Sequence, residues 1–174
     1  MIGLARALGN REIGAVIGDL PGCGESLLGL DEVTIEDWRE AIFRLGKDLT
    51  KDYGSPPHVA SIRGGALIDH AATASSWWRF ACASGQDLLR PLLRTQRISG
   101  AGNGNLFAGY PTSSRLIKEL ETATPEDVAG PFRECSVPVI GTPLWRRAEP
   151  DEDAALTGAL ADDLAQWIRT CAAA

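Results

Sequence analysis

The sequence predicts an α/β fold in which a parallel sheet of about four strands is flanked by helices. Two observations lead to this fold class. Short apolar runs alternate along the chain with longer segments of helical periodicity. The runs also lack polar alternation, which is typical of strands buried on both faces of a parallel sheet. The 174 residues have the length of one domain, so we expect a single domain over residues 1–174.

The first half of the chain contains the clearest helix and the two best strand signals. Thr34 and Asp37 form a capping-box pattern, apolar residues then recur at helical spacing, and Gly54 is a plausible stop. The elements expected here are a helix over 2–8, a strand over 13–18, a turn over 19–26, a helix over 34–53, a strand over 58–62 and a helix over 64–74.

The second half continues the alternation up to a long closing helix. Pro138 indicates that the last strand pairs irregularly or at an edge, because proline cannot donate to a ladder. The expected elements are a strand over 78–83, a helix over 86–97, a glycine- and asparagine-rich loop over 99–105, a helix over 113–122, a strand over 135–141 and a helix over 153–170.

Composition excludes several classes of partner. The formal net charge of -6 disfavours nucleic acid, since phosphate binding needs a basic face. No apolar run is long enough for a membrane span, and the N-terminus lacks a signal-peptide pattern, so we expect a cytoplasmic protein. The four cysteines form no C-x-x-C pair, and we expect neither a metal site, a cofactor nor a disulfide framework.

A glycine- and proline-rich turn follows the first expected strand directly. It begins with Asp19 and reads DLPGCGES. Asp can accept hydrogen bonds from the following backbone, and glycine permits a positive φ. Ligand sites in open α/β sheets lie at the carboxyl ends of strands, so Asp19 is a binding candidate. A plain turn with no ligand explains the same residues equally well.

The second turn, Ser61-Ile62-Arg63-Gly64-Gly65, connects the next strand to its helix. Small residues around a sharp strand-to-helix turn are typical of a nucleophile elbow, whose central residue stands at the top of the sheet. That residue must be a nucleophile in a hydrolase, but here it is Arg63, whose guanidinium stays protonated. Ser61 lies two residues earlier, where its side chain should still point into the strand, so a displaced nucleophile at Ser61 is the less favoured interpretation.

The chain resembles the α/β-hydrolases, and more narrowly the second type of hydrolase associated with the exosortase A system. The segments that carry the resemblance are DLPGCGES (19–26), DWREA (37–41), SIRGGALI (61–68), SGQDLLRPLLR (84–94), AGY (108–110) and GTPLWRRAEP (141–150). The resemblance implies an α/β-hydrolase-like sheet and a link to bacterial exopolysaccharide systems. It also implies that an arginine at the elbow is usual in that family.

The same resemblance implies that the N-terminal strands of the fold are missing. The loop that would supply one N–H of an oxyanion hole would then be absent, which leaves the Gly64 N–H. A sheet without those strands would expose an edge, so we expect a homodimer or a partner that covers it. A gene product that has lost its upstream sequence would look the same.

The remaining parts of a catalytic triad are not found. Hydrolases of this fold carry the histidine after the last strand, but no histidine follows His70, and we expect structural roles for His58 and His70. Glu149 and Asp151 follow the last expected strand. They either pair with Arg63 or cap the final helix, and capping is the reading that we favour.

These residues lead to two functional hypotheses. In the first, the chain is an accessory component without a classical triad that binds a small anionic or acyl ligand through Arg63 and the Gly64 N–H. In the second, it is an active esterase or acyl-transfer enzyme with an atypical site, for which Ser61 and Glu149 are the catalytic candidates.

Overall fold

The computed structural model describes residues 1–98, 106–107, 110–141, 143 and 153–173. The chain divides into two compact units, and each is described by itself below. One consists of residues 19–132, and the other combines residues 1–18 with residues 133–174. The fold is mixed α/β.

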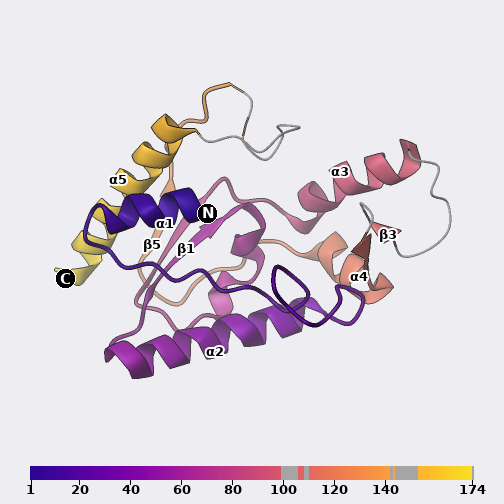
Figure 1. Cartoon of the computed structure of the whole chain (residues 1–174), viewed down its shortest axis with the longest axis horizontal. Coiled ribbons are helices and arrows are strands. Elements are labelled where there is room, and N and C mark those ends of the chain that lie inside the picture. Colours follow the sequence, from indigo (N-terminus) through magenta and orange to yellow (C-terminus); the bar gives the residue numbers. More distant parts are fainter. Residues whose placement is uncertain (99–105, 108–109, 142, 144–152, 174) are drawn as a thin grey trace. The chain divides into compact units, whose positions relative to one another are not determined.

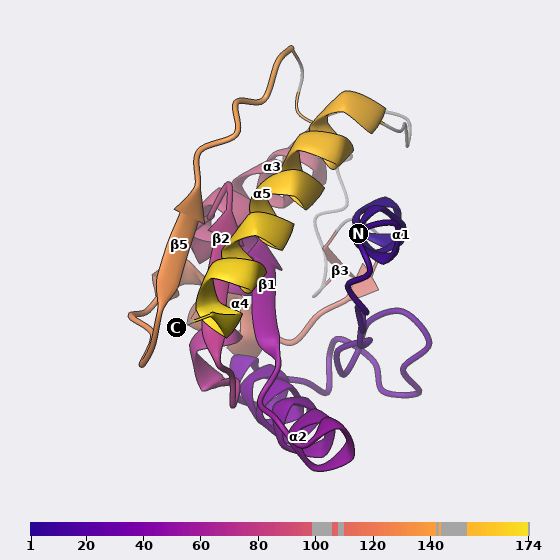
Figure 2. The same cartoon turned by 90° about the vertical axis from the view of Figure 1, so that its left-hand side faces the viewer.

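The unit of residues 19–132 is built on two parallel strands, β1 (His58–Ile62) and β2 (Ser76–Phe80). They lie side by side in register from His58 opposite Ser76 to Ile62 opposite Phe80 (Figure 2). All five residues of β2 are buried, as expected for a strand covered on both faces. The other elements of this unit are α2 (Ile35–Tyr53), η1 (Arg63–Leu67), η2 (Asp69–Ala71), α3 (Gly85–Ile98), β3 (Leu106–Phe107), β4 (Tyr110–Pro111) and α4 (Ser114–Thr122).

Helix α2 begins and ends as the sequence predicts. Thr34 and Asp37 form the complete capping box, and Gly54 closes the helix with a φ of 78°. Only glycine adopts that left-handed conformation without steric cost. The buried core of this unit joins α2, α3, α4 and η1 through Val33, Ile35, Leu67, Ile68, Leu89, Leu116 and Leu120. Figure 1 shows α3 and α4 close together at one end of the unit.

The unit of residues 1–18 and 133–174 pairs two helices, α1 (Ile2–Gly9) and α5 (Ala154–Ala172), which lie side by side (Figure 1). Arg11 reaches α5 with a hydrogen bond of 2.8 Å from Nε to Asp162. Arg133, in β5 (Phe132–Cys135), binds Asp163 of α5 through two hydrogen bonds. Two arginine–aspartate pairs therefore connect the segments at Arg11 and Arg133 to α5.

The expected strand over 13–18 is wrong. These residues form no strand, and Val16 and Ile17 are 57% and 47% exposed. An apolar run becomes a buried strand only if neighbouring strands supply hydrogen bonds on both sides. None of the strands in the described part of the chain pairs with this run. The composition of the run favoured a strand, but no strand within the described ranges supplies the hydrogen bonds that would stabilise one.

Three further expected elements differ from the structure in their position or their type. The strand expected over 78–83 begins two residues earlier, as β2, and the strand expected over 135–141 is β5, which ends at Cys135. The helix expected over 64–74 consists of two short 3-10 segments, η1 and η2. The short hairpin of β3 and β4 was not expected. The loop expected over 99–105 lies outside the described residues.

Candidate functional site

The turn after β1 is sharp, with a left-handed backbone at its tip. Arg63 follows the strand directly and has a φ of 54°. A residue with a Cβ pays about 1–2 kcal/mol for this left-handed conformation, because Cβ approaches the following carbonyl. Such strain persists only where the surrounding structure imposes it, and it is common at functional sites. Arg63 is therefore held at the tip of a strained turn.

The two glycines after Arg63 have different surroundings. A Cβ at Gly64 would stand 2.6 Å from Cδ1 of Leu88 in α3, so a side chain there requires the end of the Leu88 side chain to shift. A Cβ at Gly65 would stand 3.5 Å from the Cβ of Ser61, which is an ordinary contact. An alanine at position 64 therefore has to displace the end of the Leu88 side chain, while position 65 has space for a methyl group.

Arg63 lies near the start of α3. The N–H of Ala83 donates to the Arg63 carbonyl at 3.4 Å, which ties the elbow to the segment after β2. The Asp87 carboxylate has a lowered pKa, chiefly because it accepts hydrogen bonds from the side chain and backbone of Ser84. The positive charges of Arg90 and Arg63 lower it further. The charge of Arg63 is thus close enough to Asp87 to lower the pKa of that carboxylate.

The segment after the elbow is not the α-helix that would aim several N–H groups and a dipole at a ligand. The helical path stops at Ile68, where φ is -130°. Asp69 turns inward there, and its carboxylate accepts two hydrogen bonds from Arg79 of β2 at 2.6 and 2.8 Å. The burial of this ion pair therefore outweighs the helical pattern of the sequence after Arg63. The Gly64 N–H keeps its place beside Arg63, but only a 3-10 segment of five residues follows it.

Ser61 is placed unfavourably for catalysis. It is 6% exposed, and its side chain faces Gly65. A histidine–serine contact does exist nearby, since His58 Nδ1 lies 2.8 Å from the Oγ of Ser76. That serine is fully buried. His58 also begins β1, three residues and about 10 Å along the strand from Ser61. Burial lowers the pKa of His58.

Asp19 acts as a turn residue in this structure. Its carboxylate accepts the backbone N–H of Glu25 at 3.1 Å and lies against Gly24, whose φ is 58°. Trp38 of α2 fastens the turn by donating to the carbonyl of Pro21 at 2.8 Å. Because no strand precedes Asp19, the reason for expecting a ligand at this point is lost. Of the two interpretations of this turn, the contacts support the structural one.

The acidic candidates near the C-terminus lie outside the described residues, and these are Glu149 and Asp151, together with the neighbouring Trp145. The last helix, α5, is capped by Asp153, whose carboxylate accepts the N–H of Leu156 at 2.9 Å.

A second polar cluster in the same unit has no signal in the sequence. Arg79 donates to the carbonyl of Glu126 at 2.7 Å in addition to its bonds with Asp69. The Glu126 carboxylate accepts a hydrogen bond of 2.6 Å from Arg39 of α2 and lies 3.6 Å from His70 Nε2. These five residues come from four separate segments. No periodicity or motif connects them, so only the fold could bring them together.

His70 therefore belongs to this second cluster and not to the turn at Arg63.

Among the described residues, no group of three metal-ligand side chains comes together. In the same part of the chain no helix has the length and apolar character to cross a membrane. All four cysteines are free.

No protein-family model, curated protein or solved structure matches the chain.

Proposed function

We propose that this protein is a non-catalytic, α/β-hydrolase-like accessory component that binds a small anion at Arg63. The observation that carries the proposal is the left-handed φ of 54° at Arg63, at the tip of the turn after β1. A guanidinium binds carboxylate or phosphate through a planar fork of donors. A strained backbone that holds such a group at the tip of a turn is consistent with a binding role.

The surroundings of the elbow support binding over catalysis. Ser61 is buried, and the contacts of His58 and His70 are with Ser76 and Glu126. Among the described residues, no hydrogen bond joins either histidine to the Ser61 hydroxyl. A nucleophile without a base to accept its proton is weak. The resemblance to hydrolases associated with exosortase A supports placing this accessory role in exopolysaccharide and protein-sorting systems.

Titration with inorganic phosphate and with acetate, followed by NMR of backbone amides, tests the proposal. We expect saturable shifts around residues 62–65, and their loss in Arg63→Ala. Arg90→Ala is the matched control, because Arg90 also lies near Asp87 but its side chain is 74% exposed on α3. Binding that is unchanged in Arg63→Ala contradicts the proposal.

The alternative function, an active esterase or acyl-transfer enzyme, rests on the retained elbow and on Ser61. It requires turnover of short-chain esters by the pure protein, abolished by Ser61→Ala. Such a result would replace the accessory role with catalysis. Turnover that survives Ser61→Ala would come from another group or from a contaminant.

A further inference from the structure

Acidic and basic residues are segregated along the unit of residues 19–132. Residues 19–38 contain six acidic residues and neither lysine nor arginine, whereas residues 88–118 contain five basic residues and no acidic one. The acidic set is Asp19, Glu25, Asp31, Glu32, Glu36 and Asp37, and the basic set is Arg90, Arg94, Arg97, Arg115 and Lys118. In a chain with a net charge of -6, the second segment is a local excess of positive charge.

The acidic segment contains a loop, residues 25–32, that carries two exposed leucines. Leu27 is fully exposed and Leu28 is 51% exposed. Glu25 before them and Asp31 after them are exposed as well, and neither carboxylate forms an ion pair within the described part of the chain. Adjacent apolar side chains with a charged rim are typical of interaction surfaces. We refer to this surface as the acidic leucine loop.

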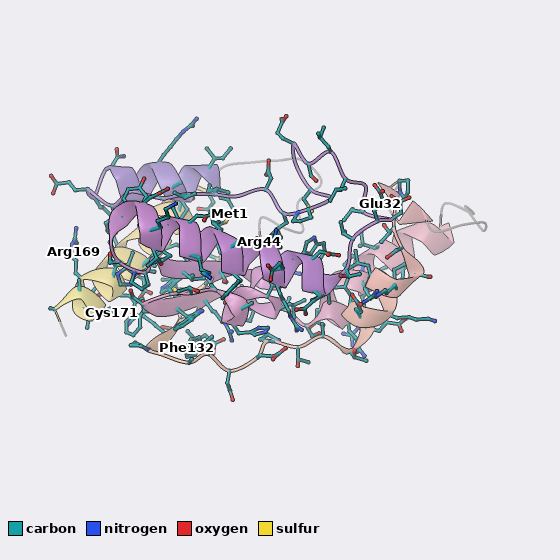
Figure 3. The ribbon with its side chains drawn as sticks, turned by 90° about the horizontal axis from the view of Figure 1, so that it is seen from below. Met1, Glu32, Arg44, Phe132, Arg169 and Cys171 are labelled. Carbon is teal, nitrogen blue, oxygen red and sulfur yellow. The ribbon has the colours of Figure 1, made fainter. Side chains whose placement is uncertain are left out.

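Hydrogen bonds within the loop hold the leucines in place. The Ser26 hydroxyl accepts the N–H of Gly22 at 2.9 Å and the N–H of Leu28 at 3.2 Å. The Glu32 carboxylate, at the end of the loop ahead of α2 (Figure 3), accepts the N–H of Gly29 at 3.0 Å. A loop that is ordered before binding loses little conformational freedom when it docks, so it can bind with a small contact area.

Helix α3 provides a surface of the opposite charge. Arg90 and Arg94 are four residues apart and therefore lie on the same face of the helix. Both are exposed, and so is Pro91, which adds apolar surface beside them. Arg90 lies 3.4 Å from Asp87, and Arg94 forms no ion pair among the residues that the structure describes. This arginine face (Arg90, Pro91 and Arg94) can bind carboxylates through the guanidinium forks.

The two surfaces are complementary in charge but are not paired within one chain. Among the described residues, no ion pair joins a carboxylate of residues 19–38 to a basic side chain of residues 88–118. A second copy of the chain supplies the missing partner for each surface. We propose that the protein self-associates, with the acidic leucine loop of one copy docked on the arginine face of another. A two-fold dimer contains this contact twice. The proposal does not depend on the function proposed for Arg63.

Sedimentation equilibrium of the unsubstituted protein at two salt concentrations is the first test. In about 0.01 M salt the Debye length is about 30 Å, and in about 1 M salt it is about 3 Å, so the attraction between the two surfaces is screened only at high salt. We expect a dimer that forms at low salt and dissociates at high salt.

Charge reversal on each surface is the second test. The double variants Arg90→Glu with Arg94→Glu, and Glu25→Lys with Asp31→Lys, should each weaken association by about ten-fold or more, because like charges then meet. An equal mixture of the two double variants should dimerise again. Each loop in the mixture meets a helix face of the opposite sign, and a folding defect in either variant could not produce this recovery.

Matched controls separate the two surfaces from general effects of charge and apolar exposure. Arg44→Glu should leave the dimer intact, because Arg44 is equally exposed but lies along α2 (Figure 3). Leu27→Ser with Leu28→Ser should weaken the dimer, whereas Tyr53→Ser should not, although Tyr53 is 76% exposed.

Three outcomes overturn the proposal. The first is a monomer at both salt concentrations. The second is a mixture of the two charge-reversed variants that associates no better than either variant alone. The third is unchanged association in the variant that lacks both leucines.

Discussion

Arg79 and Asp69 form a two-pronged ion pair in the interior of the protein, with hydrogen bonds of 2.8 and 2.6 Å. The two side chains are only 7% and 3% exposed. The pair connects β2 to η2, and Trp77 donates to the carbonyl of Asp69 at 2.9 Å beside it. Burying two charges costs several kcal/mol for each, and only an intact pair with its hydrogen bonds offsets that cost.

Removal of one partner of this pair should destabilise the protein strongly. Asp69→Ala leaves the Arg79 guanidinium buried without its counter-ion, and we expect the free energy of unfolding to fall by about 3–5 kcal/mol. Urea denaturation measures the change. Glu40→Ala is the control, because its pair with Arg44 is exposed and worth about 0–1 kcal/mol. Similar losses in the free energy of unfolding for the two variants would show that the buried pair contributes no more to stability than the exposed pair.

Two glycines in helices should respond oppositely to the same substitution. A Cβ at Gly46 of α2 would stand 2.7 Å from the backbone oxygen of Thr73, whereas a Cβ at Gly158 of α5 would meet nothing within 4 Å. We expect Gly46→Ala to destabilise the fold by about 1–3 kcal/mol through overpacking. Gly158→Ala should stabilise it by about 0.5–1 kcal/mol, since alanine is the better helix former. Thermal and urea unfolding of both variants checks the difference in sign.

Replacement of Arg63 by glycine should separate stability from binding. Glycine adopts the positive φ at this position without strain, so Arg63→Gly should raise the free energy of unfolding by about 1 kcal/mol. The same variant should lose the anion binding proposed for the elbow. Urea denaturation and the phosphate titration, performed on one sample, measure both effects. Lower stability in Arg63→Gly would mean that the contacts of the side chain outweigh the backbone strain.

The capping box of α2 should make stability depend on pH in the acid range. Hydrogen bonds from the side chain and backbone of Thr34 lower the pKa of Asp37 below its ordinary value of 3.8. A group with a lowered folded-state pKa contributes fully above its unfolded pKa, and the contribution is lost as the pH falls through the folded value. Asp37→Asn should therefore show a smaller loss of stability between pH 5 and pH 2 than the unsubstituted protein. Urea midpoints across that range provide the measurement, and parallel curves would contradict it.

Local patterns in the sequence were sufficient for the elements whose signals are short-range. The capping box at Thr34 and Asp37, the stop at Gly54 and strand β1 appear as predicted, because each depends on neighbours within a few residues. The sharp turn after β1 belongs to this group as well. A strand followed by small residues was enough to predict a sharp turn at Arg63, and the backbone is left-handed there.

Tertiary structure decided the features that depend on distant partners. The run over 13–18 has the composition of a strand, but none of the strands that the structure describes pairs with it. The helical pattern after Arg63 ends at Ile68, where the buried pair of Asp69 and Arg79 forms instead. The hydrogen bond from Arg39 to Glu126 joins residues 87 positions apart. Hydrogen-bond partners and the burial of charge are properties of the folded chain, so the sequence alone determined the local turns and caps, and packing determined which groups meet.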